Sequence, residues 1–338
     1  MQTLKAVDLF AGAGGATAGL RGAGFQVVYA VDSDAEAAAS YCANHAGTQV
    51  EVADIRELSP CSVRDALYLA PGELALLKTC PPCQPYSSLS RSKDRRLGSE
   101  LVRSTVEWVD AFEPTSVMFE NVPGVATSNG FKDLVKGLRA REYDVDWRVL
   151  NAAQFGVPQK RRRLILVALK GHSDGLGEDF WTPVAQRVRS AAAILRGMLK
   201  LEGQDELLDR PRKLSAMVQR RVNLIPQNGS RFDLPKHLQL KCHQRLDSRS
   251  AAEAYGRIRS TGPCATITTR CTTVSCGRFV HPDRNRGLTL REAAVLQSFP
   301  PTYKFVGSHG TIERQIGNAV PAKLVEVVAG RLAHLLKG

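Results

Sequence analysis

Residues 4–32, LKAVDLFAGAGGATAGLRGAGFQVVYAVD, carry the pattern that is most informative about the fold. An apolar run over 4–9 enters a glycine-rich turn, a short apolar helix follows, and a second apolar run ends on Asp32. This order of strand, turn, helix and strand is typical of a parallel α/β sheet whose first turn lies against a ligand. Taken singly, the glycines fit a plain tight turn equally well.

The glycine turn departs from the dinucleotide-binding pattern. Gly12, Gly14 and Gly15 would let the backbone approach a ligand at the start of the helix, but Thr17 stands where that pattern needs its third glycine. A nucleoside ligand without phosphates therefore fits better than a dinucleotide.

The alternation of strands and helices continues through the first 170 residues. Further strands are expected at residues 25–31, 49–52, 74–78, 115–119, 143–150 and 164–169, and helices at 16–21, 35–44, 101–112 and 131–141. From about Gly171 the chain breaks into short basic pieces rich in proline and glycine, with helices expected only near 191–201, 289–297 and 323–336. The sequence predicts a mostly parallel sheet and a second, smaller, irregular domain.

Positive charge is concentrated in one region of the 338-residue chain. The net formal charge is +13, yet residues 1–158 hold 15 basic and 19 acidic side chains whereas residues 159–285 hold 24 and 11. Such a regional excess favours a polyanionic partner. The start of the chain, MQTLKAVDLF, does not have the pattern of a signal peptide, the eight cysteines form no regular framework, and no apolar run could span a bilayer. We therefore expect a cytoplasmic protein.

Polar residues follow several expected strands at equivalent positions. Asp32, Asp54, Cys83 and Glu120 each lie just past a strand. In sheets of this kind ligands bind beyond the carboxyl ends of the strands, where a carboxylate can accept from ribose hydroxyls or a base amino group. One such acid would be an ordinary surface group, but several at equivalent positions indicate a single crevice.

The stretch TCPPCQPYSSLS, residues 79–90, is open to three interpretations. A redox pair would open a helix, which Pro82 and Pro85 disfavour, and a zinc half-site would need a second CxxC. A nucleophile needs one cysteine, a fixed backbone and a partnering acid. We favour Cys83 as nucleophile and Glu120, in MFENVPG (118–124), as an acid that donates a proton to a ring nitrogen.

The stretch GVPQKRRRLILVAL, residues 156–169, places basic groups before an apolar strand. Strand alternation would put Gln159, Arg161 and Arg163 on one face, and that face can point into a site. Arginine suits a carbonyl oxygen or a phosphate, although a basic run before a buried strand is usually a solvated flank.

Together these segments resemble the cytosine-5 DNA methyltransferase family. The family's motifs occur in order and span nearly the whole chain: DLFAGAGG (8–15), PPCQPYS (81–87), ENVPG (120–124), QKRRR (159–163), LTLREAAVLQSFP (288–300) and QIGNAVP (315–321). The resemblance implies a Rossmann-like class I sheet that binds the methyl donor S-adenosyl-L-methionine (AdoMet), formed by residues 1–170 and 286–338. Residues 171–285 would then form the DNA target-recognition domain.

The resemblance also implies roles for individual residues. Cys83 would be the nucleophile, Glu120 the group that engages the flipped base, and Arg163 its pocket partner, with Arg161 and Gln159 in support. Asp32 would hold the ribose, and Asp54 and Ile55 the adenine. The other residues implied on the cofactor side are Phe10, Gly12, Gly14, Gly15, Pro82, Leu101, Asn318 and Val320. The basic loop SRSKDRRLGS (90–99) is suited to closing over a phosphate backbone.

The chemistry explains why these residue types are needed. C5 of cytosine is too weak a nucleophile to take a methyl group directly, so a thiolate adds at C6, assisted by an acid at N3. C5 then takes the methyl group, and loss of the C5 proton expels the thiol. The base must first leave the stack, at a cost of a few kcal/mol.

The implied activity is that of a DNA (cytosine-5-)-methyltransferase. We expect a monomer acting on a specific sequence of double-stranded DNA, either beside a cognate restriction endonuclease or alone, with no metal and no membrane. A tRNA cytosine-5 methyltransferase of the same family and a non-catalytic DNA-binding regulator on the same fold remain alternatives.

Departures from the family pattern surround the expected nucleophile. Thr79 and Cys80 precede PPCQ where the family often has glycine, and Tyr86 replaces a frequent phenylalanine. Cys80 puts a second thiol near Cys83, so oxidative pairing of the two is a hypothesis. The spacing of residues 264, 271, 276 and 281, three cysteines and a histidine, matches no closed zinc pattern.

Overall fold

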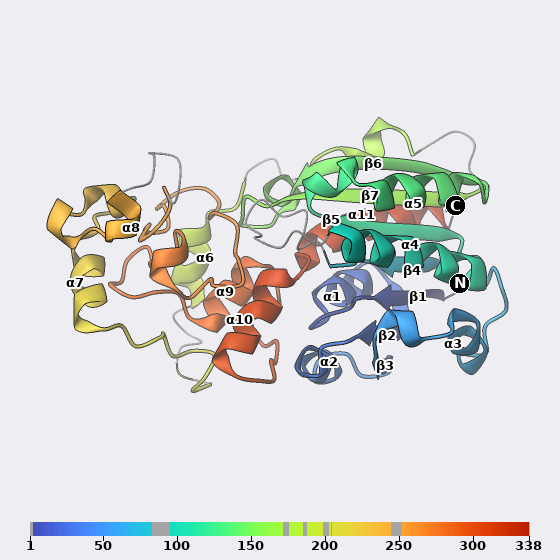
Figure 1. The fold of residues 1–338 in the computed structure, drawn as a ribbon, viewed down its shortest axis with the longest axis horizontal. Helices are drawn as coiled ribbons and strands as arrows, with labels where there is room; N and C mark the ends of the chain where they lie inside the picture. The colour runs from blue at the N-terminus through green and yellow to red at the C-terminus, as the bar shows by residue number, and fades with distance from the viewer. Residues whose placement is uncertain are drawn as a thin grey trace.

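The computed structural model describes residues 3–82, 95–171, 176–184, 188–198, 203, 205–244 and 252–337, with only the backbone described at 95–98 and 243. Within these residues the chain forms a seven-stranded sheet of order β3-β2-β1-β4-β5-β7-β6 (Figure 1). The strands are β1 (Leu4–Leu9), β2 (Phe25–Asp32), β3 (Gln49–Val52), β4 (Leu76–Thr79), β5 (Ser116–Asn121), β6 (Tyr143–Asn151) and β7 (Arg162–Lys170). Neighbours among β1 to β5 pair in parallel, and β7 pairs antiparallel with β5 and β6. The predicted α/β class is confirmed.

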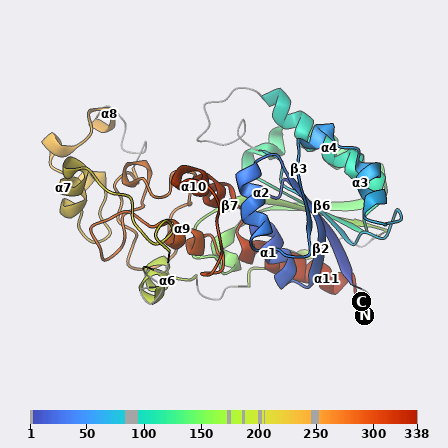
Figure 2. The same cartoon turned by 90° about the horizontal axis from the view of Figure 1, so that it is seen from below.

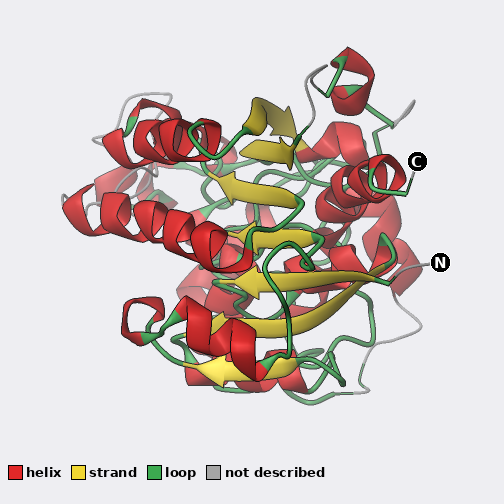
Figure 3. Cartoon of the chain, turned by 90° about the vertical axis from the view of Figure 1, so that its right-hand side faces the viewer, coloured by secondary structure: helices red, strands yellow, loops and turns green. Residues whose placement is uncertain are grey.

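Helices cover both faces of the sheet, as Figures 2 and 3 show from two further directions. One face is covered by α3 (Pro60–Ala66), α4 (Arg95–Phe112) and α5 (Asn129–Arg139). The other face is covered by α1 (Gly15–Gly22), α2 (Ala35–Cys42) and, from the far end of the chain, α11 (Ala322–Leu335). Trp108 of α4 is buried and stacks on Tyr29 of β2, with ring centroids 6.1 Å apart. Two apolar layers therefore hold the sheet.

Side-chain caps explain where several helices begin. Asp34 accepts hydrogen bonds from the backbone N–H groups of Glu36 and Ala37 at the start of α2, and Ser128 caps α5 in the same way. At α9 (Leu290–Leu296), Thr289 and Glu292 form a capping box. Each cap satisfies backbone donors that the first helical turn leaves without partners.

The remaining helices lie beside the sheet region (Figure 1). They are α6 (Ala191–Gly197), α7 (Ala216–Leu224), α8 (Lys241–Gln244), α9 and α10 (His309–Asn318). The expected helix at 191–201 is described as α6, and residues 199–202 lie outside the described part. Helices α3, α7, α8 and α10 have no counterpart among the expected helices. No helix in the described residues is long and apolar enough to cross a membrane.

In the irregular region, buried arginine side chains bond to backbone carbonyl groups that are not paired in a sheet. Arg257 and Arg278 are both almost fully buried. Arg257 donates to the backbone carbonyl oxygens of residues 222, 225, 281 and 284. Arg278 donates to those of residues 228, 229 and 257. These bonds satisfy carbonyl groups that no sheet pairs. Part of the basic excess of residues 159–285 is therefore structural and is not presented at the surface.

One hydrophobic cluster joins the two sides of residue 285, the expected domain boundary. It contains residues of α6, α9 and α10 together with Ile258, Ile267 and Phe279. By contrast, α11 packs on α1 beneath the sheet. The chain thus packs with the irregular region through α9 and α10 before α11 returns to the sheet.

Candidate active site

Glu120 and Arg163 form an ion pair at the carboxyl end of β5. The Glu120 side chain is 5% exposed, and its Oε1 lies 2.9 Å from Arg163 Nε. The Cys80 thiol donates to Oε2 of the same carboxylate, with Sγ 2.7 Å away. The structure therefore brings together two residues predicted for the base site and fixes both oxygens of the carboxylate.

The segment that leads to Cys83 is anchored on both sides. Cys80 N donates to Leu9 O at 3.3 Å, and Asn121 Nδ2 donates to Pro81 O at 3.1 Å. These bonds tie the end of β4 to the ends of β1 and β5. Cys83 itself lies outside the described residues, as do Arg91 and Lys93 and the side chains of residues 95 and 96. Pro82, the last residue described before this segment, is exposed.

Arg161 and Gln159 do not join Glu120. Arg161 donates to the carbonyl oxygens of residues 267, 317 and 319, at 2.8 Å, 3.0 Å and 3.1 Å. The Gln159 amide bonds to Gln297 Oε1 at 2.8 Å and to Leu296 O at 3.2 Å, and it accepts from Ile267 N at 2.8 Å. Both side chains are buried. These contacts hold the start of β7 against residues 288–300 and 315–321, and the supporting role of Arg161 and Gln159 in the base pocket stays a prediction.

The glycine turn is closed behind and open in front. Gly14 has φ +86°, and a Cβ there would lie 2.5 Å from His45 Nε2; at Gly15 it would lie 2.9 Å from Val320 O. At Gly12, with φ +54°, nothing lies within 4 Å of the Cβ position. Phe10 also has a left-handed backbone, with φ +56°, which is uncommon for a residue other than glycine. Neighbouring protein atoms therefore leave no room for a side chain at Gly14 or Gly15, whereas Gly12 faces open space.

Asp32 lies next to this open face. Its Oδ2 accepts from Gly12 N at 2.7 Å and its Oδ1 from Asp34 N at 2.9 Å. Burial raises the pKa of Asp32, although both amide bonds act in the opposite direction. Each oxygen keeps capacity for a further hydroxyl donor.

The other residues expected around the cofactor are spread along the strand ends. Asp54 forms a bidentate pair with Arg56, whose hydrogen bonds lower the pKa of the carboxyl to about 2. Ile55, Leu101 and Phe10 share one apolar cluster. Val320 is buried behind the turn, and Asn318 is exposed at the end of α10.

Comparison with known proteins identifies the family. The family model described as C-5 cytosine-specific DNA methylase matches residues 4–334. The chain belongs to this family. The methylase is 31% identical to the type II methylase M.HgiDII of Herpetosiphon aurantiacus, over 98% of this chain and 96% of that protein. It is 28% identical to the type II methyltransferase M.AgeI of Thalassovita gelatinovora, over 96% and 98%.

Solved structures share the fold. A putative DNA modification methyltransferase encoded within a prophage of E. coli matches with a TM-score of 0.73 and 21% identity, over 99% of this chain and 100% of the other. The Dnmt2 methyltransferase of S. pombe matches with a TM-score of 0.67 and 19% identity, over 99% of both chains. The predicted family, fold class and enzyme class are confirmed: the protein is a DNA (cytosine-5-)-methyltransferase, of a family whose methyl donor is AdoMet.

The methylase braces its glycine turn with a buried pair that the sequence does not reveal. Tyr303 Oη donates to Ala13 O at 2.5 Å and lies 2.8 Å from His45 Nε2, which is 3.1 Å from Gly14 O. Burial lowers the pKa of His45 to about 4, so the imidazole is neutral at pH 7. Residues just after the motif LTLREAAVLQSFP thus support the turn from behind.

A buried ion pair lies beneath the same turn. Lys78 Nζ is 2.8 Å from Asp8 Oδ1, with the side chains 2% and 0% exposed, and Thr17 Oγ1 donates to Asp8 Oδ2 at 2.7 Å. Burial alone would lower the pKa of Lys78, but Asp8 above all, with Cys80 and Glu120, raises it overall. Thr17 therefore stands in place of a third glycine because its hydroxyl is a partner of Asp8.

The cysteines late in the chain belong to the core. Cys264 and Cys271 are fully buried, and burial raises the pKa of Cys264 to about 12. No group of three or more potential ligands among the described residues could hold a metal ion.

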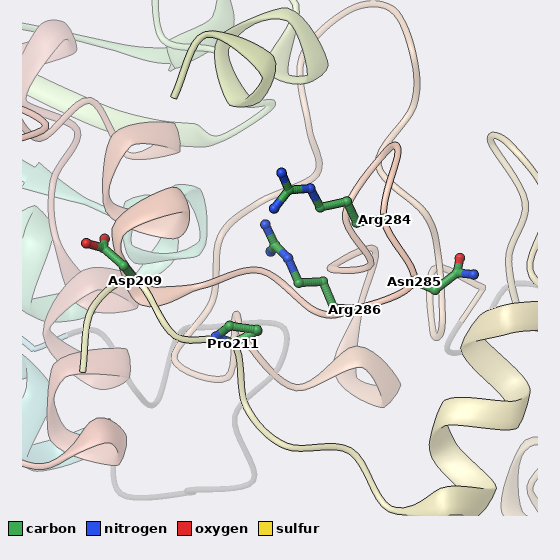
Figure 4. A pocket seen from close by; sticks show the side chains of 5 residues that line it. All are labelled: Asp209, Pro211, Arg284, Asn285 and Arg286. Atoms are coloured by element: carbon green, nitrogen blue, oxygen red, sulfur yellow. The ribbon is translucent and has the colours of Figure 1, made fainter. Parts of the chain in front are cut away.

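The methylase also has a cavity away from the strand ends, where Arg284 and Arg286 lie side by side, with Asp209, Pro211 and Asn285 (Figure 4). Arg286 is held there by Glu292, with both bonds at 2.8 Å.

Proposed function

We propose that the enzyme transfers the methyl group of AdoMet to C5 of a cytosine flipped out of duplex DNA, through a covalent bond between Cys83 and C6. The observation that carries this proposal is the Glu120 carboxylate, held by Arg163 and Cys80 at the carboxyl end of β5. Its neighbour Asn121 is tied to Pro81, two residues before Cys83. We therefore propose that adjacent strands β4 and β5 bring the nucleophile and the acid to one edge of the sheet.

The residues around the glycine turn fit AdoMet. The half-buried Asp32 carboxylate can accept from ribose hydroxyls, and the open face of Gly12 lets a ligand approach the backbone. Phe10, Ile55 and Leu101 supply an apolar surface suited to an adenine ring. Pro82, Asp54, Asn318 and Val320 complete the proposed set. AdoMet supplies an electrophilic methyl group when it is bound.

On the base side, each residue has one task. Glu120 bonds to N3 of the cytosine and so favours addition of the Cys83 thiolate at C6. Arg163 keeps the carboxylate in place, because its Nε forms an ion pair with Oε1 while its Nη1 group donates to the carbonyl of Arg162 at 2.7 Å. After transfer to C5, loss of the C5 proton and departure of the thiol restore the ring. Arg161 and Gln159 support this pocket by holding the start of β7.

We assign DNA recognition to residues 171–285 and catalysis to residues 1–170 and 286–338. Arg212, Arg259 and Arg270 are exposed in or beside the irregular region and can meet phosphate groups. Arg284, which lines the cavity of Figure 4, adds a further arginine at the end of this region. Because similar proteins are named type II methylases and methyltransferases, we propose a modification enzyme of a restriction-modification system.

The test is methyl incorporation from labelled AdoMet into unmethylated genomic DNA, with tRNA as the competing substrate. We expect label in duplex DNA, none in tRNA, and none with C83A. Bisulfite sequencing of the product then gives the target sequence. Label in tRNA alone would replace the proposal with an RNA methyltransferase, and DNA binding without transfer would replace it with a regulator.

A further inference from the structure

We infer that Cys80 is a positioning residue for the methyl-transfer reaction: its thiol holds the second oxygen of Glu120 while Arg163 holds the first. This inference rests on the proposed role of Glu120. It concerns a residue to which the predicted base and cofactor sites give no role.

The sheet register explains why Cys80 reaches Glu120. Leu77 pairs with Val117 and Thr79 with Phe119 in the parallel β4–β5 ladder. Continuing this register places Cys80 opposite Glu120, and side chains opposite each other in a ladder lie on the same face. Thr79 points to the other face, where its Oγ1 lies 3.3 Å from Thr105 Oγ1. A cysteine at residue 80 therefore projects onto the carboxylate without any distortion of the strand.

The Cys80 backbone is fixed, so its side chain has a defined direction. Its N–H bonds to Leu9 O, and the next carbonyl, that of Pro81, accepts from Asn121. The side chain is partly buried against the apolar layer under α1 and α11. With so little freedom, the thiol forms its bond to Glu120 Oε2 at small entropic cost.

The charges around Glu120 make a donor useful on this oxygen. Among described residues, the charged and titratable groups nearest to it are Arg163 on β7, Cys80 after β4, and Lys78 on β4 with its partner Asp8 on β1. Arg163 contacts only Oε1 in this set. Without the thiol, the carboxylate could turn about its last torsion, and its free oxygen would no longer be fixed toward the base.

The experiment compares C80A, C80S and the control C61A, in which an exposed cysteine on α3 is replaced. Single-turnover methyl transfer to unmethylated genomic DNA and the dissociation constant for the same DNA are measured for each. We expect C80A to lose about three- to tenfold in rate, as for loss of one weak donor, with unchanged DNA affinity. C80S keeps a donor and should stay within about twofold of the native enzyme.

Two outcomes would overturn the inference. The first is a C80A rate equal to those of the native enzyme and C61A. The second is equal loss in C80A and C80S, which would assign Cys80 to packing alone. The native enzyme and C83A in the same assay report on the proposed function separately, since a native enzyme without transfer would refute that proposal and not the role of Cys80.

Discussion

Replacing Lys78 by methionine should destabilise the sheet region strongly. The ion pair with Asp8 is fully buried, so K78M removes the cation and leaves the carboxylate with Thr17 as its remaining side-chain donor. Breaking a buried pair from one side costs about 3–5 kcal/mol, and because Thr17 remains we expect about 3 kcal/mol. For a chain of this size that corresponds to a fall in Tm of about 6 °C.

Urea unfolding followed by tryptophan fluorescence measures this loss directly, because the three tryptophans, residues 108, 147 and 181, all lie in or against the sheet region. The double variant D8L/K78M removes both charges and should recover to within about 1 kcal/mol of the native enzyme. K170M is the matched control: Lys170 is also 2.8 Å from its partner Glu113, but the two side chains are 37% and 50% exposed. Its loss should not exceed about 1 kcal/mol. A K78M loss as small as that of K170M, or a double variant as unstable as the sum of D8L and K78M, would refute the reasoning.

Three further predictions follow from the site and the charge distribution. E120Q and R163K should each lower the rate of single-turnover methyl transfer by about 100-fold or more without changing DNA affinity. The control E113Q, at a surface ion pair, should change neither quantity. A rate for E120Q within about threefold of the native rate would contradict the role of Glu120 as the acid. Burial lowers the pKa of His45 and of His281 from 6.5 to about 4. As the pH falls, both histidines are therefore protonated in the unfolded chain before they are protonated in the folded protein. Stability should therefore fall as the pH drops from 6.5 to 4, by at most about 1.4 kcal/mol per pH unit for each histidine, and H281Q should reduce this slope in urea titrations; an unchanged slope would count against it. DNA affinity should fall steeply with salt, and R259Q and R270Q should each reduce the logarithmic slope by about one, whereas R56Q beside β3 should not; equal slopes for all three would remove these residues from the DNA surface.

The sheet could be predicted from the sequence because its signals are local. Apolar runs predict each strand of the described residues to within two residues, and the glycine turn predicts the edge at which a ligand would bind. The pairing of Glu120 with Arg163 is implied by the family motifs alone, since Arg163 begins β7 and meets the end of β5 only because the two strands are antiparallel. Motif order along the chain then gives the family without any knowledge of contacts.

The supporting contacts could not be predicted, because their partners are remote in sequence. Arg161 bonds to carbonyl groups more than 100 residues away, and an arginine in a basic run looks like a ligand contact until those groups are placed. Lys78 at the end of an apolar strand looks like a solvated terminus, yet Asp8 lies directly across the ladder. Arg257 and Arg278 count as surface charge in the sequence but are buried against backbone. Each case depends on three-dimensional packing that composition does not encode.

The proposed covalent step has a direct test. Genomic duplex DNA copied with 5-fluorocytosine in place of cytosine is incubated with the enzyme and AdoMet. Release of the enzyme needs the C5 hydrogen to leave as a proton; because fluorine at C5 cannot leave in this way, the Cys83 adduct should persist. We expect a protein–DNA band that survives denaturing electrophoresis, is absent with C83A, and maps by peptide sequencing to residue 83. Methyl transfer to ordinary DNA without any such adduct, or an adduct that maps to another residue, would contradict the mechanism.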